Sequence, residues 1–143
     1  MFKQVMEIHD LVDRATVTGA DVANYLREYD IARLRVESVQ GEKGSTDFVK
    51  MELPGSNGRM QGGSAPTLGF VGRLGGVGAR PERIGLVSDA DGAITVLACA
   101  LKLALMARGG DILPGDVIVA THICPCAPTQ PHEPVPFMGS PVD

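Results

Sequence analysis

This chain of 143 residues has few cysteines, no long apolar run and no signal-peptide pattern. It has only three cysteines, too few for the disulfide framework of a small secreted protein. It has no apolar run long enough to cross a bilayer, and its N-terminus lacks the basic region and apolar core of a signal peptide. We therefore expect a cytoplasmic protein without membrane association.

Clustered basic charge is also lacking. The formal net charge is -4, whereas binding of nucleic-acid phosphates needs clustered Lys and Arg, so nucleic acid is not the expected partner. What is present is a globular composition, with 44% hydrophobic and 21% charged residues. The length suits a single domain over residues 1–143. Glycine and proline concentrate after Gly55, which indicates many tight turns in the second half.

The first half of the chain predicts two packing helices followed by a hairpin. Apolar residues recur at helical spacing over residues 2–12, and Thr18 with Asp21 three residues later resembles a capping box that begins the second helix. Residues 32–39 alternate, with Arg33, Arg35 and Glu37 on the exposed face, and 47–53 alternate again after a turn at 41–44. The segments that follow are expected to be a loop at 54–64, a strand at 67–71, a glycine-rich loop at 72–81 and a buried strand at 84–87.

The clearest element is an apolar helix over residues 92–108, which must be buried on more than one side. Gly109 and Gly110 end it, and the β-branched run at 117–120 indicates a central strand. The strand, helix and strand over 84–120 predict a right-handed parallel crossover. The fold class is therefore α/β, a three-layer mixed sheet flanked by helices, with a proline-rich loop or tail at 125–143.

The acidic turn at the start of the apolar helix is the first candidate site. Asp89 and Asp91 lie between the carboxyl end of a strand and the start of a helix, where ligands bind in open α/β sheets. Two carboxylates there could hold a divalent cation. The alternative is purely structural, since aspartate at a helix start satisfies backbone N–H groups and favours the helix dipole.

The second candidate site follows the last strand. If the chain stays extended, His122, Cys124 and Cys126 point to one side, which could suit zinc. His132 and Glu133 follow in the same loop. The alternative is that both cysteines are small packing residues under a loop. A nucleophilic thiol is a third reading, and it requires an activating environment that the sequence does not reveal.

The glycine-rich loop could place backbone N–H groups near an anion, with Arg73 and Arg80 adding charge for substrate binding. It matches neither a dinucleotide-binding fingerprint nor a Walker loop. A close-packed loop between strands is the alternative.

Several segments carry a resemblance to known proteins: GEKGSTDF, APTLGFVGRLGGVGARPE, GLVSDADGA, LPGDVIVATHICP and APTQPHEPVPFMGSPVD. They resemble an uncharacterised bacterial and archaeal family known only as a domain of unknown function, over nearly the whole chain. Members of that family continue further, so the chain is expected to be the N-terminal portion of a longer hydrolase-like domain.

The layout is more distantly similar to co-catalytic zinc aminopeptidases of the phosphorylase/hydrolase-like fold. The D-x-x-G turn of Asp89 matches the turn that carries the metal-bridging aspartate in those enzymes. Two of their motifs are missing, because Gly72-Arg73-Leu74 replaces His-x-Asp and Ile123-Cys124-Pro125 replaces Glu-Glu. Without them, one metal ligand and the general base are not where that chemistry needs them.

Two functional hypotheses follow. One is a metal-dependent, peptidase-like hydrolase for a small peptide or amino-acid derivative, with zinc or another divalent metal on Asp89, Asp91, His122 and His132 and with Glu133 as the base. The other is a non-catalytic relative that binds a small ligand or a partner. Because the apolar helix needs cover on several sides, we also expect a homo-oligomer or packing against a missing C-terminal half.

Overall fold

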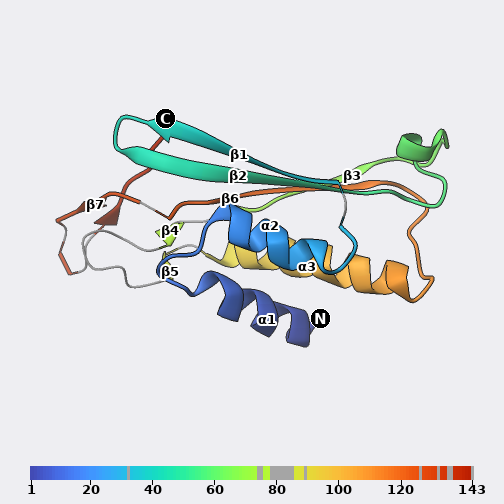
Figure 1. Cartoon of the computed structure of the whole chain (residues 1–143), viewed down its shortest axis with the longest axis horizontal. Coiled ribbons are helices and arrows are strands. Elements are labelled where there is room, and N and C mark those ends of the chain that lie inside the picture. Colours follow the sequence, from blue (N-terminus) through green and yellow to red (C-terminus); the bar gives the residue numbers. More distant parts are fainter. Residues whose placement is uncertain are drawn as a thin grey trace.

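The computed structural model describes residues 1–31, 33–73, 76–77, 86–88, 90–125, 127–131, 133–134 and 137–142. A four-stranded mixed sheet in the order β1-β2-β6-β3 carries three helices on one face (Figure 1). The main elements are α1 (Phe2–Val12), α2 (Gly19–Arg27), β1 (Arg33–Gly41), β2 (Gly44–Leu53), β3 (Leu68–Val71), α3 (Asp91–Arg108) and β6 (Val117–Ile123). The shorter ones are η1 (Arg59–Gln61), β4 (Gly76–Val77), β5 (Leu86–Ser88), β7 (Thr129–Gln130) and β8 (Phe137–Met138). The predicted α/β mixed sheet is confirmed.

The start of α2 is fixed by the predicted capping box. The Thr18 hydroxyl accepts from the Asp21 backbone N–H at 3.2 Å, and the Asp21 carboxylate accepts from the Thr18 backbone N–H at 2.8 Å. The Asp47 carboxylate of β2 accepts from the Gly19 N–H at 2.8 Å, which ties the helix to the sheet. These bonds satisfy N–H groups that a helix start otherwise leaves unpaired.

The predicted hairpin is confirmed, and its buried and exposed faces are as expected. β1 and β2 pair antiparallel around the turn, with Gly41 opposite Gly44. Leu34 of β1 and Val49 and Met51 of β2 are buried beneath the helices, whereas Arg33, Arg35 and Glu37 are exposed. We call the surface on their side, away from the three helices, the open face of the sheet.

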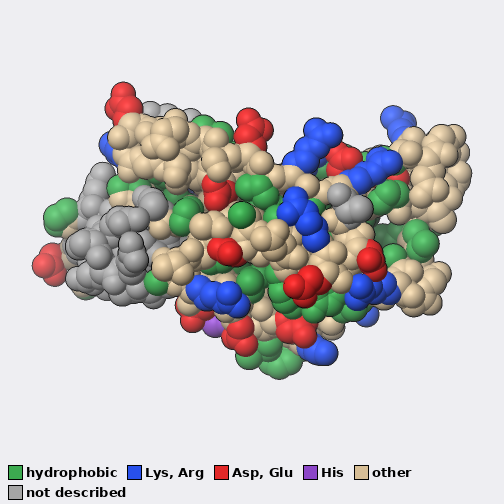
Figure 2. All heavy atoms as spheres, in the orientation of Figure 1, with side chains coloured by type: hydrophobic (Ala, Val, Ile, Leu, Met, Phe, Trp, Pro, Cys, Tyr) green, Lys and Arg blue, Asp and Glu red, His purple; other side chains and the backbone are tan. Residues whose placement is uncertain are grey.

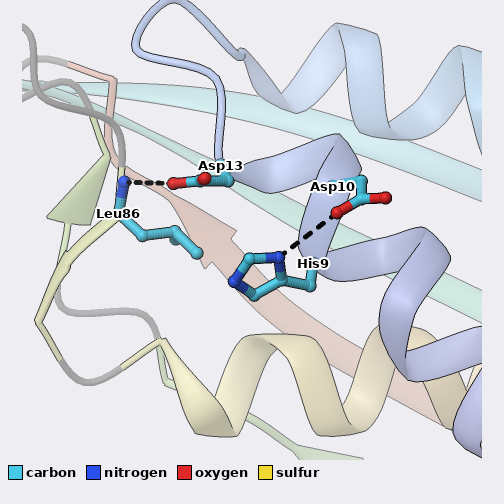
Figure 3. A network of polar contacts seen from close by, with 4 residues as sticks. All are labelled: His9, Asp10, Asp13 and Leu86. Atoms are coloured by element: carbon cyan, nitrogen blue, oxygen red, sulfur yellow. Dashed lines mark hydrogen bonds and ion pairs between the residues drawn. The ribbon is translucent and has the colours of Figure 1, made fainter.

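The parallel crossover begins at a different strand from the one expected. β6 pairs in parallel with β3, so α3 lies in the connection from β3 to β6. β5 overlaps the expected strand at 84–87, but it pairs antiparallel with β4 and not with the main sheet. β4 lies within residues 72–81, for which the sequence predicted only a glycine-rich loop. Short apolar runs at 68–71 and 84–87 are equivalent by periodicity, so the sequence could not say which one joins the main sheet. The backbone N–H of Leu86 donates to Asp13 Oδ1 at 3.3 Å, which links β5 to the end of α1 (Figure 3).

The core is centred on α3, which packs against α1 on one side and against the sheet on the other. Its buried residues are Ala93, Val96, Leu97, Ala98, Ala100, Leu101 and Ala104. This arrangement explains why the sequence of α3 is apolar on more than one side. In the part of the chain that the structure describes, no helix is long and apolar enough to cross a membrane.

The loop between β2 and β3 is held by one buried carboxylate. Asp116 is 1% exposed, and its oxygens accept from the backbone N–H groups of Gly55 and Met60, both at 2.9 Å. These hydrogen bonds hold the pKa of Asp116 below its ordinary value of 3.8.

Because the folded-state pKa is the lower one, the ionised Asp116 stabilises the fold above the unfolded-state pKa, and this contribution is lost as pH falls through the folded-state pKa. Asp116→Asn is therefore expected to lower the urea midpoint clearly at about pH 7 and much less at about pH 2.5. The same change at the exposed Asp111 is the control and should have little effect at either pH. Equal losses for Asp116→Asn at both pH values would contradict the ionised role.

Candidate functional site

Three segments that are far apart in the sequence meet at one edge of the sheet. Because β3 and β6 are parallel, their carboxyl ends lie at the same edge, where ligands bind in open α/β sheets. The start of α3 is joined to this edge, since the Ala93 backbone N–H donates to the Arg73 carbonyl at 3.1 Å. The edge therefore holds the residues after β3 and the first turn of α3 on the helix side, whereas His122, opposite Phe48, lies near the end of β6 on the open face of the sheet.

Two glycines make this meeting possible. A Cβ atom on Gly72 would lie 2.1 Å from the Gly92 carbonyl oxygen, and one on Gly92 would lie 2.6 Å from the Arg73 carbonyl oxygen. Any side chain at either position would therefore separate the end of β3 from the start of α3.

His122 is held from two sides by residues of β2. Its Nδ1 lies 3.1 Å from the hydroxyl of buried Thr46, and its ring stacks on Phe48 with centroids 5.9 Å apart and planes inclined by 29°. The register places Phe48 directly opposite His122. Sheet pairing thus fixes the imidazole orientation.

The hydrogen bonds of Thr46 also decide which nitrogen of a neutral His122 carries the proton. The Thr46 hydroxyl donates to the Ile123 carbonyl at 3.2 Å. A hydroxyl has one proton, so toward His122 it acts as the acceptor and Nδ1 is the donor. The lone pair of the neutral ring is then on Nε2, which is the arrangement of a histidine that accepts a proton or binds a metal.

The structure describes only some of the other candidate site residues. Asp91 is the first residue of α3 and is exposed, and Glu133 is exposed as well. Asp89, His132, Cys126 and Arg80 lie outside the described residues. Within the described part of the chain, no group of three or more His, Cys, Asp and Glu side chains could hold a metal ion.

The cysteine pattern does not lie on one strand. β6 ends at Ile123, so Cys124 follows the strand, and the extended run of His122, Cys124 and Cys126 stays a prediction because Cys126 lies outside the described residues. The Cys124 side chain is buried, with Sγ 3.8 Å from the Ser45 carbonyl oxygen. Burial of this kind is typical of a packing cysteine, and it disfavours the nucleophile reading.

Arg73 is exposed, and its carbonyl supports the start of α3.

Sequence reasoning missed Thr46 and Phe48 as parts of this site. The strand was expected to begin at Asp47, whereas β2 begins at Gly44 and therefore includes Thr46. The two-residue spacing of Thr46 and Phe48 did place them on one face of a strand. Nothing local in the sequence revealed that His122 would lie opposite that face, because pairing between β2 and β6 is a long-range property.

A family described as protein of unknown function (DUF1177) matches residues 37–143. The chain belongs to this family. The family resemblance seen in the sequence is thereby confirmed. No curated protein matches the sequence.

Solved structures share the fold at low identity. The bottromycin maturation enzyme BotP in complex with Mn is 19% identical with a TM-score of 0.53, and the match covers 88% of this chain and 31% of BotP. A mutant of tomato leucine aminopeptidase is 13% identical with a TM-score of 0.51, over 85% of this chain and 26% of that one. A glutaminyl cyclase from an Acidobacteriales bacterium is 11% identical with a TM-score of 0.53, over 84% of this chain and 42% of that one. The predicted aminopeptidase-like fold is confirmed, and the chain spans less than half the length of each of these proteins.

Proposed function

We propose that this protein is a divalent-metal-dependent hydrolase for a small peptide or amino-acid derivative, with its site at the carboxyl ends of β3 and β6. The observation that carries the proposal is the environment of His122. Its hydrogen bond to Thr46 and its stacking on Phe48 orient the ring. An imidazole held in this way at the ligand-binding edge of an α/β sheet is prepared to bind a metal or accept a proton.

The structural neighbours support the same chemistry. They include a leucine aminopeptidase and a maturation enzyme in complex with Mn, and the resemblance in sequence is to zinc aminopeptidases. Zinc and Mn are therefore the metals to test on this chain.

The described donors do not make a complete metal site, because they include no group of three or more ligands. Asp91 and His122 are the described residues that we assign to it, and Asp89 and His132 are the proposed remainder. We assign Glu133, which is exposed, as the general base.

A second reading is a non-catalytic relative that binds a small ligand or a partner. It is favoured by the sequence, in which Gly72-Arg73-Leu74 and Ile123-Cys124-Pro125 replace the His-x-Asp and Glu-Glu motifs of the zinc aminopeptidases. Under this reading, the protein binds no metal and has no hydrolase activity.

Metal analysis of protein purified without chelator distinguishes the two readings. We expect about one tightly bound divalent metal per chain by elemental mass spectrometry, lost in His122→Ala and in Asp89→Ala. Thr46→Val should weaken metal affinity about 10–100-fold, because it removes the hydrogen bond that orients His122, and Thr46→Ser should restore it. Hydrolysis of aminoacyl p-nitroanilides should change in the same order.

His9→Ala is the matched control, because His9 is exposed on α1, where its Nδ1 lies 3.5 Å from Asp10 Oδ1 (Figure 3). It should leave metal content unchanged. Wild-type protein that contains no metal and also ignores added zinc and Mn would eliminate the hydrolase proposal in favour of the binding protein. Rapid labelling of a cysteine at neutral pH, abolished by Cys124→Ser, would instead support the thiol reading.

A further inference from the structure

The open face of the β1–β2 hairpin carries a pairing of charges that does not serve stability. Arg35 of β1 lies directly opposite Lys50 of β2, and both side chains are exposed on this face. Like charges directly opposite each other destabilise a pair of strands. The arrangement therefore calls for an explanation outside the stability of the sheet.

A second arginine, Arg33, adds to this positive charge. Glu52 lies opposite Arg33, but its Oε1 is 2.9 Å from the Nζ of Lys50. Among the described residues, neither Arg33 nor Arg35 has an ion pair or a side-chain hydrogen bond. Lys50 and the two arginines together hold the pKa of Glu52 below its ordinary value, so Glu52 is ionised and compensates one of the three positive charges.

These side chains surround a hollow. It has a volume of about 310 Å³ and is lined by Arg33, Leu34, Arg35, Lys50 and Glu52. In Figure 2, basic side chains interspersed with acidic ones lie along the right part of the upper edge, where Figure 1 places β1 and β2 and no helix covers the sheet. Glu37 is on the same face, two residues beyond Arg35, but does not line the hollow.

We propose that this hollow binds a small molecule through a dianionic phosphoryl group. Three cations and one carboxylate leave two positive charges, which match the charge of about −1.5 to −2 of a phosphate monoester at neutral pH. Guanidinium groups pair with phosphate oxygens through two parallel N–H donors, and Arg33 and Arg35 provide two such groups two residues apart on one strand. The small volume suits a compact ligand, so we assign a phosphorylated small molecule. This site is independent of the proposed hydrolase function.

Titration of the full chain with inorganic phosphate and with glycerol 3-phosphate, followed by backbone amide NMR in a phosphate-free buffer, tests the proposal. We expect saturable shifts confined to the strands around Arg33, Arg35 and Lys50. Arg35→Gln and Arg33→Gln should each weaken binding about tenfold or more. Glu52→Gln should strengthen binding several-fold, since it removes the competing carboxylate, and a merely structural role would not produce that increase. Lys102→Gln, at an exposed lysine of α3, is the matched control and should change nothing.

The proposal is wrong if the amide shifts increase linearly with phosphate concentration and occur near surface lysines throughout the chain. It is equally wrong if acetate produces the same shifts. It is also wrong if Arg35→Gln binds like the wild type. A phosphoserine peptide that binds more than about tenfold tighter than glycerol 3-phosphate would replace the small molecule by a phosphopeptide. Metal content and peptidase activity are measured separately, so failure here leaves the proposal for His122 intact.

Discussion

Leu101→Ala is expected to lower the free energy of unfolding by about 2–5 kcal/mol. Leu101 is completely buried in α3, which packs against α1 on one side and the sheet on the other. Truncation therefore removes buried methyl groups and leaves a cavity between rigid elements that collapse only partly.

Urea denaturation followed by circular dichroism measures this loss. The control is Ile112→Ala, because Ile112 is 46% exposed after the end of α3 and should cost well under the core value. If Leu101→Ala lost no more stability than Ile112→Ala, α3 would not be the centre of the core. Urea denaturation is measured in the same way on both purified variants, so differences in expression do not affect the comparison.

The elements that the sequence predicted well are those with a local physical cause. The two-residue alternation of β1 and the capping box of Thr18 and Asp21 are encoded within a few residues, and both are present. The apolar sequence of residues 92–108 could only fit a helix covered on more than one side, and α3 is such a helix.

What the sequence could not predict depends on pairing between distant strands. Residues 84–87 were expected to enter the main sheet because they are apolar and precede α3, yet β3 takes that place beside β6. Hydrophobic periodicity identifies a strand but not its neighbour. The same limit hid the contact between Thr46 and His122, which depends on the register of β2 against β6.

The sequence indicated the region of the candidate site but not which residues contact each other there. His122 and the start of α3 both lie near the carboxyl ends of the parallel strands β3 and β6, but on opposite faces of the sheet, and the strand before the helix is not the one expected. β6 ends one residue before Cys124 and its side chain is buried, which favours the packing alternative over the ligand and nucleophile readings. The sequence alone could not reveal either fact, since a strand end and a buried loop depend on the packing around them.

The second large effect concerns the contact that builds this edge. Gly72→Ala is expected to cost about 1–3 kcal/mol or more, because its Cβ would lie 2.1 Å from the Gly92 carbonyl oxygen and backbone would have to move. The movement would separate the end of β3 from the start of α3, so ligand or metal binding at the edge should weaken together with stability. Urea denaturation and metal affinity of the same variant measure both effects.

Gly69→Ala supplies the control within the same strand. Nothing lies within 4 Å of a Cβ at Gly69, so alanine there meets open space. Alanine also loses less backbone entropy on folding than glycine does, so the change should be neutral or stabilising by up to about 1 kcal/mol. A loss at Gly72 without a loss at Gly69 identifies steric contact with α3, and not the loss of a strand glycine, as the cause. If both variants were equally stable, the close approach of β3 and α3 would not be what positions the start of α3 at this edge.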